Sequence, residues 1–432
     1  MPAELFETVD VFLPSDGETL NQEVAAHWQR GDSVEAQIYL SQRDDDAVML
    51  HLSGLTAEQR RILTEHRVIV DARFQHHAVD GYGLRMPGLV VTPQGTAIAV
   101  VGQRVGSMAD GGHETNIMMS RSEDGGRTWT RQRQIFAEPE INTFLGPIFV
   151  DRTTNVVYVA FWKLPQEEGN GLAYFAPYAK QGGGFWMVKS ADEGQTWSDA
   201  FYVRPSPNPA GWIAWSNNSV HGIQLALGPR TGRLVIPAFL YKEGETGQAP
   251  GVRGGLMYSD DHAESWHAGA VLPEGSDESV LEETVDGGIY VNYRKDRPYY
   301  NGQRWFARSE DYGESFSEYG QHEEQVTPCC HAGITRFSGA EDGGDNILLF
   351  TNPRGPGRSN LTVRMSRDEG RTWSVGRTVT RDLVGYSDLA VTPDETILCV
   401  WEGGTKRYHD KISVARFNLE WLLADEDGTD PQ

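Results

Sequence analysis

A chain of 432 residues is long enough for two or three ordinary domains, or for one large β domain with an appendage. Its 39% hydrophobic and 23% charged residues are typical of a soluble globular protein, and no stretch approaches a membrane span. The formal net charge of −23 argues against nucleic acid and anionic membranes as partners, and an anionic substrate would require a local cluster of arginines.

Residues 1–66 predict a small β-rich module. Apolar residues alternate over 34–40 and 48–52, which indicates two amphipathic strands, and Thr56 to Gln59 is typical of the capping box that begins a short helix. We expect this module to pack against the following domain or to form a homo-oligomer, with carbohydrate binding as the alternative. The N-terminus lacks the basic start and apolar core of a signal peptide, which fits an intracellular protein or one whose leader has been removed.

An eight-residue motif, Ser-x-Asp-x-Gly-x-Ser/Thr-aromatic, then occurs five times. The copies are SEDGGRTW at 122–129, SADEGQTW at 190–197, SDDHAESW at 259–266, SEDYGESF at 309–316 and SRDEGRTW at 366–373. Their starts are 68, 69, 50 and 57 residues apart. Four short strands with turns need roughly 40 to 50 residues, the size of a propeller blade. The spacing therefore predicts one blade per copy, with loop insertions mostly before the third.

Each copy also predicts a particular turn. Asp and Ser side chains can accept hydrogen bonds from backbone N–H groups, Gly supplies a residue with positive φ, and the terminal aromatic would pack inward. We expect a hairpin clip on the outer part of a blade. Calcium loops are the weaker alternative, because each copy offers too few oxygen ligands at the EF-hand spacing.

Short apolar strands separated by Gly, Asn, Asp and Pro turns fill the gaps between the copies. They include 89–92, 156–161, 233–239, 288–292 and 346–350, and long helical periodicity is almost absent from 80 to 412. The sequence thus predicts an all-β fold, a six-bladed β-propeller over 67–425 followed by an acidic tail at 426–432. The stretch from Arg85 to the first copy, with a C-terminal strand near 411–417, would complete the ring.

Four further motifs accompany the repeats. LRMPGLVVTPQG (84–95) contains Arg85, ESVLEETVDGGIYVNYR runs from Glu278 to Arg294, RSNLTVR begins at Arg358, and VGYSDL (384–389) contains Tyr386. With these motifs, the chain from about 68 to 422 resembles the bacterial and animal exo-α-sialidases (neuraminidases), glycoside hydrolases that have a six-bladed propeller with Asp-box repeats.

The resemblance implies that Arg85, Arg294 and Arg358 bind the carboxylate of the substrate, with Arg354 a nearby competitor for the third place. Sialic acid carries this carboxylate on its anomeric carbon. A guanidinium can form two parallel charge-assisted hydrogen bonds with a carboxylate, which a lysine cannot do. Leu84 is a mild departure, since the family usually has Tyr or Phe before the first arginine.

The resemblance also implies the catalytic groups. Asp110, in SMADGGH (107–113), is the candidate acid/base, 14 residues before the Asp of the first copy. Tyr386 is the candidate nucleophile, because a neutral phenol avoids the repulsion that a carboxylate would meet at an anomeric centre bearing a carboxylate. A phenol with a pKa near 10 needs a base, and Glu278 is the candidate. A solvated loop Asp and a buried core Tyr are the structural alternatives.

Two supporting residues complete the implied site. Glu402, in VWEGG (400–404), resembles the family residue that holds the first arginine, and Arg104, in VGQRV (101–105), matches one that contacts the C4 hydroxyl. Gly146 stands where many relatives have an Asp that joins this contact, so recognition at C4 is expected to differ. Trp212, Trp215 and His221 could line the pocket, although blade core is the simpler interpretation.

Taken together, the sequence predicts a retaining exo-α-sialidase acting on sialylated glycans or free sialosides, with no cofactor and no metal. The cysteines, including Cys329-Cys330-His331, lack both a disulfide framework and a second cluster of zinc ligands. The alternatives are a hydrolase of a related 2-keto-3-deoxy sugar acid (deaminated sialic acid or an octulosonic acid), a trans-sialidase, and a non-catalytic glycan-binding propeller.

Overall fold

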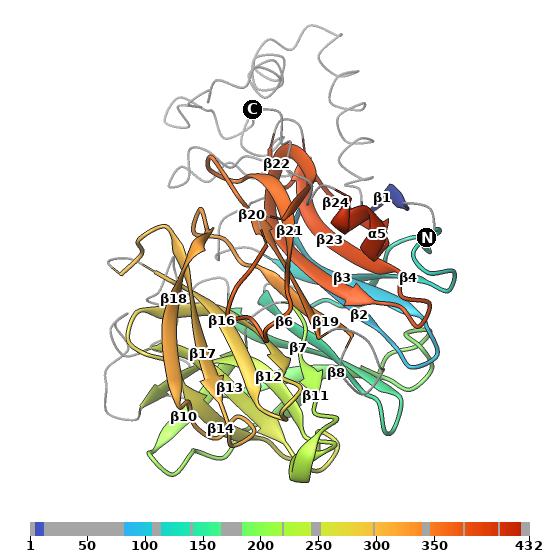
Figure 1. Cartoon of the computed structure of the whole chain (residues 1–432). Helices are drawn as coiled ribbons and strands as arrows, with labels where there is room; N and C mark the ends of the chain where they lie inside the picture. The colour runs from blue at the N-terminus through green and yellow to red at the C-terminus, as the bar shows by residue number, and fades with distance from the viewer. Residues whose placement is uncertain are drawn as a thin grey trace, which may run out of the picture.

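The computed structural model describes residues 5–12, 82–105, 114–138, 141–165, 184–217, 220–242, 252–296, 299–338, 346–374, 376–404 and 407–424. Over these residues the protein is a ring of antiparallel sheets (Figure 1), which confirms the predicted all-β fold and a propeller-like arrangement. The helical elements among them are one turn of 3-10 helix, η3 (Gly228–Arg230), and α5 (Leu419–Leu423), whose N-terminus is capped by the side chain of Asn418.

The first four sheets follow one another along the chain, and neighbouring strands within each sheet are antiparallel. The first contains β2 (Tyr82–Val91), β3 (Ala97–Val105), β4 (Thr115–Ser122) and β5 (Arg133–Phe136). The second contains β6 (Ile141–Asp151), β7 (Val156–Pro165), β8 (Phe185–Ser190) and β9 (Phe201–Val203). The third contains β10 (Trp212–Asn217), β11 (Ile223–Gln224), β12 (Leu234–Lys242), β13 (Arg253–Ser259) and β14 (His267–Val271). The fourth contains β15 (Ser276–Glu283), β16 (Ile289–Lys295), β17 (Gln303–Ser309) and β18 (Glu318–Val326).

The last sheet has seven strands and joins both ends of the chain. Its order is β1-β24-β23-β22-β21-β20-β19, from β1 (Phe6–Phe12), β24 (Lys411–Phe417), β23 (Ile397–Gly404), β22 (Arg377–Val391), β21 (Ser359–Ser366), β20 (Ile347–Pro353) and β19 (Gly333–Ser338). The long strand β22 pairs with β21 over its first half and with β23 over its second half.

The pairing of the two chain ends differs from the sequence expectation. The C-terminal strand β24 pairs with β23 and β1, and it does not pair with the sheet that contains Arg85. Residues 6–12, expected in a separate N-terminal module, form the edge strand of this last sheet. The two strands and the helix expected over 34–66 lie outside the described residues, as does the acidic tail.

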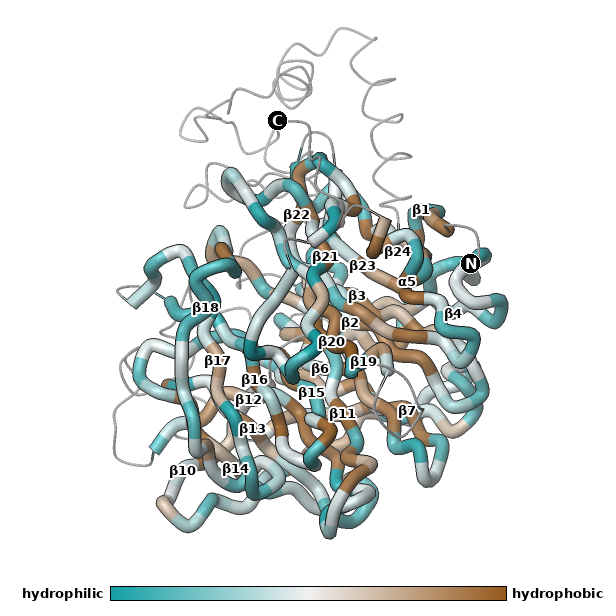
Figure 2. The backbone as a smooth tube through the Cα atoms, in the orientation of Figure 1, coloured by the Kyte–Doolittle hydropathy of each residue, from teal (hydrophilic) through white to brown (hydrophobic). Residues whose placement is uncertain are grey.

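Apolar layers between successive sheets hold the ring together. Clusters of buried aliphatic and aromatic side chains join the first sheet to the second, the second to the third, the third to the fourth, and the fourth to the last. A further cluster packs the first sheet against β22, β23 and β24, which closes the ring. Figure 2 shows the apolar residues on the strands and the polar residues on the turns, as burial of apolar surface requires.

The five repeat copies form the turns between the third and fourth strands of their sheets, as expected. In the first copy Ser122 Oγ accepts from Gly126 N at 2.9 Å, and Thr128 Oγ1 donates to Asp124 Oδ2 at 2.6 Å. The two residues at the tip of every copy have positive φ between 57° and 93°, and Ala263 adopts this conformation at 69° where the other copies have Gly. The terminal aromatics pack inward, with Trp266 1% exposed.

The innermost strands position the candidate site. The inner strands of successive sheets contact one another around the axis, with β11 linking the third sheet to β15, and β22 returns to contact β2. In four of them two successive residues oppose a single residue of the partner strand: β2 between Arg85 and Gly88, β6 between Leu145 and Ile148, β15 between Ser276 and Ser279, and β22 between Val384 and Ser387. Such bulges re-aim side chains. Met86, Gly146, Glu278 and Tyr386 all lie within these four bulges.

Candidate active site

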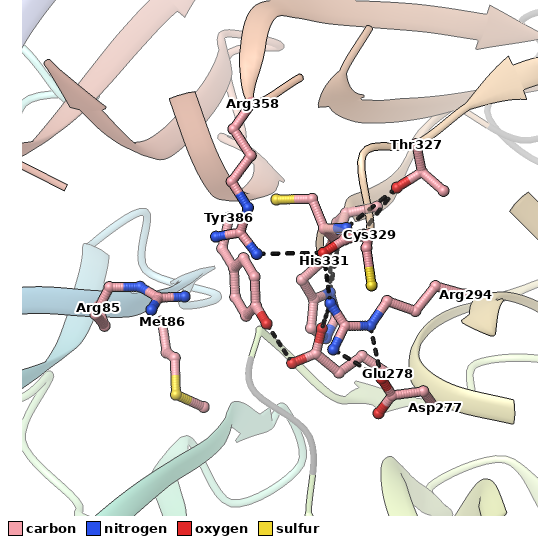
Figure 3. Close-up of polar contacts among 12 residues, drawn as sticks. Arg85, Met86, Asp277, Glu278, Arg294, Thr327, Cys329, His331, Arg358 and Tyr386 are labelled. Carbon is pink, nitrogen blue, oxygen red and sulfur yellow. Dashed lines mark hydrogen bonds and ion pairs between the residues drawn. The ribbon is translucent and has the colours of Figure 1, made fainter. Parts of the chain in front are cut away.

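A tyrosine and a glutamate from opposite parts of the sequence meet at the centre of the site. The hydroxyl of Tyr386, in the bulge of β22, donates a 2.6 Å hydrogen bond to Oε1 of Glu278, in the bulge of β15 (Figure 3). Tyr386 is 6% exposed and Glu278 9%. The ring of His331 lies 5.4 Å from the tyrosine ring. The structure therefore brings together the predicted nucleophile and its predicted base.

Arg294 joins the other side of the glutamate. Strand pairing sets Ser276 opposite Lys295, which leaves Asp277 and Arg294 as neighbours on adjacent strands. Arg294 Nη2 lies 2.7 Å from Asp277 Oδ2, and its Nη1 lies 3.1 Å from Glu278 Oε2. A single guanidinium thus contacts two adjacent carboxylates, and it fixes the carboxylate that accepts the phenolic proton.

Arg85 and Tyr386 are held by one buried carboxylate. Glu402, fully buried on β23, accepts from Arg85 Nε at 2.8 Å, from Met86 N at 2.7 Å and from Tyr386 N at 3.0 Å. Met86 has a positive φ of 64°, an uncommon conformation for a residue with a side chain. Glu402 therefore fixes both bulged strands, in addition to the predicted contact with the first arginine.

Arg358 reaches the same tyrosine from the loop before β21. Its guanidinium carbon lies 5.6 Å from the centre of the Tyr386 ring, and that of Arg85 lies 5.1 Å from it, so two cations approach one aromatic ring. Both guanidiniums also contact the ring of Tyr408. Arg354, the competing candidate, is exposed. Of the two arginines in this loop, the structure places Arg358 at the site.

Burial and charge shift the titration of these groups. Burial raises the pKa of Tyr386 well above its usual value, and Arg294, Arg85 and Arg358 oppose that shift. Burial likewise raises the pKa of Asp277 to about 6, against the effect of Arg294. The phenol is therefore protonated at neutral pH, and it can act as a nucleophile only if a partner removes its proton.

The remaining predicted residues divide into those that the structure describes and those that it does not. Arg104, on β3, is 4% exposed and lies with Nη2 3.8 Å from the sulfur of Met86, next to Arg85. Gly146 is buried in the bulge of β6. Asp110, the candidate acid/base, lies outside the described residues. Within those residues, no group of three or more His, Cys, Asp or Glu side chains could hold a metal ion.

Several residues of the site were missed by the sequence analysis. Asp277 directly precedes Glu278, and the register of β15 with β16 would have placed it beside Arg294. The sequence analysis considered Cys329 and Cys330 only for disulfides and metal binding, yet the backbone carbonyl of Cys329 contacts Arg294 and Arg358. A backbone contact of this kind has no signature in a sequence.

The expectations for the pocket residues had mixed outcomes. His221 hydrogen-bonds Asp388 at 2.7 Å, and it lines a cavity farther along the inner strands, with Arg152 and Glu282. Trp212 packs beneath the guanidinium of Arg253 and against the core between the second and third sheets. The side chain of Trp215 lies outside the described part of the chain. Within that part, no helix has the length and apolar character needed to cross a membrane.

Comparison with known proteins places these features in a family. Residues 105–400 match the family model of the BNR repeat-like domain. The chain is 33% identical over 352 residues to a sialidase of Micromonospora viridifaciens, covering 78% of this chain and 52% of that protein. It is 29% identical over 359 residues to a sialidase of Bacteroides fragilis, covering 78% of this chain and 63% of that protein. The chain therefore spans between half and two thirds of the length of these relatives.

Solved structures show the same fold at lower identity. The Hadza microbial sialidase Hz136 superposes with a TM-score of 0.65 and 22% identity, over 79% of this chain and 66% of that one. The intramolecular trans-sialidase of Ruminococcus gnavus superposes with a TM-score of 0.59 and 19% identity, over 78% of this chain and 95% of that one. At these identities the likeness concerns the fold alone.

Proposed function

The chain belongs to the sialidase family of BNR-repeat proteins, and we propose that it is a retaining exo-α-sialidase acting on sialylated glycans or free sialosides. One observation carries this proposal. The Tyr386 hydroxyl donates a hydrogen bond to Glu278, and Arg294 contacts the same glutamate. The guanidiniums of Arg85 and Arg358 lie against the tyrosine ring. A phenol with its own base, surrounded by three cations, is suited to attack beside a carboxylate.

The three arginines would bind the substrate carboxylate. Among the described residues, the buried Nη1 of Arg358 has no hydrogen-bond acceptor. A buried N–H group without an acceptor is costly, and a bound carboxylate would relieve that cost with charge-assisted hydrogen bonds. The arginines also supply positive charge locally in a chain whose net charge is −23.

The proposed reaction proceeds in two steps. Tyr386 Oη attacks the anomeric carbon as Glu278 takes its proton, and Asp110 protonates the departing glycosidic oxygen. Asp110 then removes a proton from water, which attacks the same carbon. The bond to Tyr386 breaks, and Glu278 returns the proton to the phenolic oxygen. Two inversions at one carbon give net retention.

The fold proposal that accompanies this function is a six-bladed propeller over 67–425. The seven-stranded sheet would count as two blades that share β22, since its halves pair with different neighbours. Strand β1 would then be the outer strand of the last blade. Residues 1–66 apart from that strand remain proposed as an N-terminal module, with a role in oligomerisation to be tested.

An aryl α-sialoside tests the activity directly. We expect release of the aryl group, with the α-anomer of the free sugar appearing first in a proton NMR time course. Initial appearance of the β-anomer would contradict retention. Binding of an unsaturated sialic acid analogue without any turnover would instead support a glycan-binding propeller. Transfer to an added galactoside, scored against hydrolysis, would reveal a trans-sialidase.

A second candidate substrate class follows from Gly146. This residue is buried in the bulge of β6, where it offers no side chain to a C4 hydroxyl. The carboxylate contacts would serve any 2-keto-3-deoxy sugar acid, whereas the C4 and C5 contacts would not. Aryl glycosides of the deaminated sialic acid and of an octulosonic acid, assayed beside the sialoside, separate these substrates through their kcat/KM values.

A further inference from the structure

A short turn between β18 and β19 contacts Arg294 and Arg358. It comprises Thr327, Pro328, Cys329 and Cys330. Cys329 has a positive φ of 56°, a conformation that costs energy for a residue with a side chain. Such residues persist where the surrounding structure holds them, and they gather at functional sites.

The unusual conformation accompanies one shared hydrogen-bond acceptor. The carbonyl oxygen of Cys329 accepts from Arg294 Nη1 at 2.8 Å and from Arg358 Nη2 at 3.2 Å (Figure 3). Two of the three arginines proposed to bind the carboxylate therefore meet at a single backbone atom. The oxygen carries partial negative charge only, so it orients the two guanidiniums without neutralising them.

Hydrogen bonds within the turn and from neighbouring side chains hold the turn in place. Thr327 Oγ1 accepts from Cys330 N at 3.2 Å and donates to Cys330 O at 3.3 Å. Tyr300 donates its hydroxyl to Thr327 O at 2.5 Å. Arg304, which is not one of the three carboxylate-binding arginines, is fully buried and donates from Nη1 to Cys330 O at 3.0 Å. These contacts leave the turn little freedom to rotate the Cys329 carbonyl away.

We propose that the turn 327–330 positions the carboxylate-binding arginines, and that the left-handed conformation of Cys329 sets the affinity for the substrate carboxylate. This inference rests on the proposed function. Two like-charged guanidiniums repel each other, and the shared carbonyl offsets that repulsion before a ligand arrives. Arg294 and Arg358 are then already directed toward the ligand, so less is lost in ordering them on binding.

Substitutions at Cys329 separate the backbone conformation from the thiol. Cys329→Gly adopts positive φ without strain, Cys329→Ala removes the thiol at a similar backbone cost, and Cys329→Val is β-branched and resists this conformation. We expect the Gly and Ala variants to raise KM less than the Val variant does, because both can keep the positive φ at this position. We expect the Val variant to raise KM for an aryl sialoside about tenfold, the loss from weakening one charge-assisted hydrogen bond, with kcat changed less than about threefold.

A second pair of variants tests the same turn without changing Cys329. Thr327→Val removes both hydroxyl contacts with Cys330, whereas Thr327→Ser keeps them. We expect Thr327→Val to raise KM, and to weaken the affinity for an unsaturated sialic acid analogue in calorimetry by the same factor. Thr327→Ser should show a smaller change than Thr327→Val in both KM and the affinity for the analogue. If Cys329→Val fails to fold, these two variants still test whether the turn positions the arginines.

The outcomes distinguish this inference from the proposed function. If the wild type cleaves the sialoside but Cys329→Val and Thr327→Val keep its KM and affinity, the positioning role is overturned alone. Equal losses in the Gly, Ala and Val variants would assign the effect to the thiol and would likewise overturn it. A wild type that neither cleaves the sialoside nor binds the analogue overturns the proposed function, and the positioning role with it.

Discussion

The phenolic oxygen of Tyr386 lies 2.6 Å from Oε1 of Glu278, although 108 positions separate the two residues in the chain. Each lies in a bulge of an innermost strand, and the two strands belong to different sheets. Tyr386 is also tied through its backbone N–H to Glu402, which holds Arg85. Substitution of Tyr386 or of Glu402 should therefore change the activity or the stability of the protein.

Tyr386→Phe should remove the nucleophile and leave the fold intact. The ring would still pack against Arg85, Arg358 and His331, because these contacts do not involve the hydroxyl. We expect kcat for an aryl sialoside to fall roughly 10³-fold or more, with little change in the melting temperature. Tyr319→Phe, at an exposed tyrosine, is the matched control and should keep full activity. Wild-type activity in Tyr386→Phe would contradict the nucleophile assignment.

Asp110→Ala should lose the proton donor for the leaving group. We expect hydrolysis of a sialoside with an alkyl leaving group to fall by about 10² to 10⁴. A nitrophenyl sialoside should lose less in the first step, because its leaving group needs little protonation. Full activity on both substrates would rule out Asp110 as the acid.

Glu402→Ala should damage stability and binding together. The substitution removes the buried carboxylate that accepts from Arg85 Nε and from the backbone N–H groups of Met86 and Tyr386. Removing one partner of a buried ion pair costs about 3 to 5 kcal/mol, measurable as a lower free energy of unfolding in urea. Glu402→Gln keeps an acceptor oxygen of similar shape and should lose less. Equal unfolding free energies for the wild type and Glu402→Ala would refute this supporting role.

The repeat turns should differ in their tolerance of a side chain. A Cβ at Gly370 would lie 2.8 Å from ring carbons of the fully buried Tyr290, whereas one at Gly313 would lie 3.3 Å from Ile289 Cδ1. Both glycines have positive φ, as Ala263 has in the third copy. We expect Gly313→Ala to cost about 1 to 2 kcal/mol of unfolding free energy, and Gly370→Ala about 1 to 3 kcal/mol more. Equal losses would show that the Tyr290 ring moves aside easily.

The repeat turns should also weaken in acid. Hydrogen bonds from the side chain and backbone of Thr196 lower the pKa of Asp192 to about 2, below its unfolded value near 3.9. A lowered pKa contributes stability above the unfolded value, and that contribution is lost as the pH falls toward 2. Thr196→Val should therefore melt below the wild type at pH 7, and the two melting temperatures should converge near pH 2. A constant difference across this range would contradict the assignment.

Local patterns predicted much of the fold and of the site. The Ser, Asp and Gly of each copy determine their turn because all the groups that form its hydrogen bonds lie within eight residues. The all-β class could be predicted as well, because the short apolar strands and the turn residues between them are also local patterns. The motifs around Arg85, Glu278, Arg294, Arg358, Tyr386 and Glu402 named residues that the structure brings together, although periodicity alone could not have shown that they meet.

The sequence by itself determined the repeat turns, the strand-rich class and the chemical types of the candidate site. Only the tertiary structure decided that β1 pairs with β24, that Arg358 rather than Arg354 reaches Tyr386, and that Asp277 and the Cys329 carbonyl contact Arg294. The physical reason is distance along the chain. Contacts within a turn depend on neighbouring residues, whereas contacts between sheets depend on register, bulges and backbone direction, which local patterns leave open.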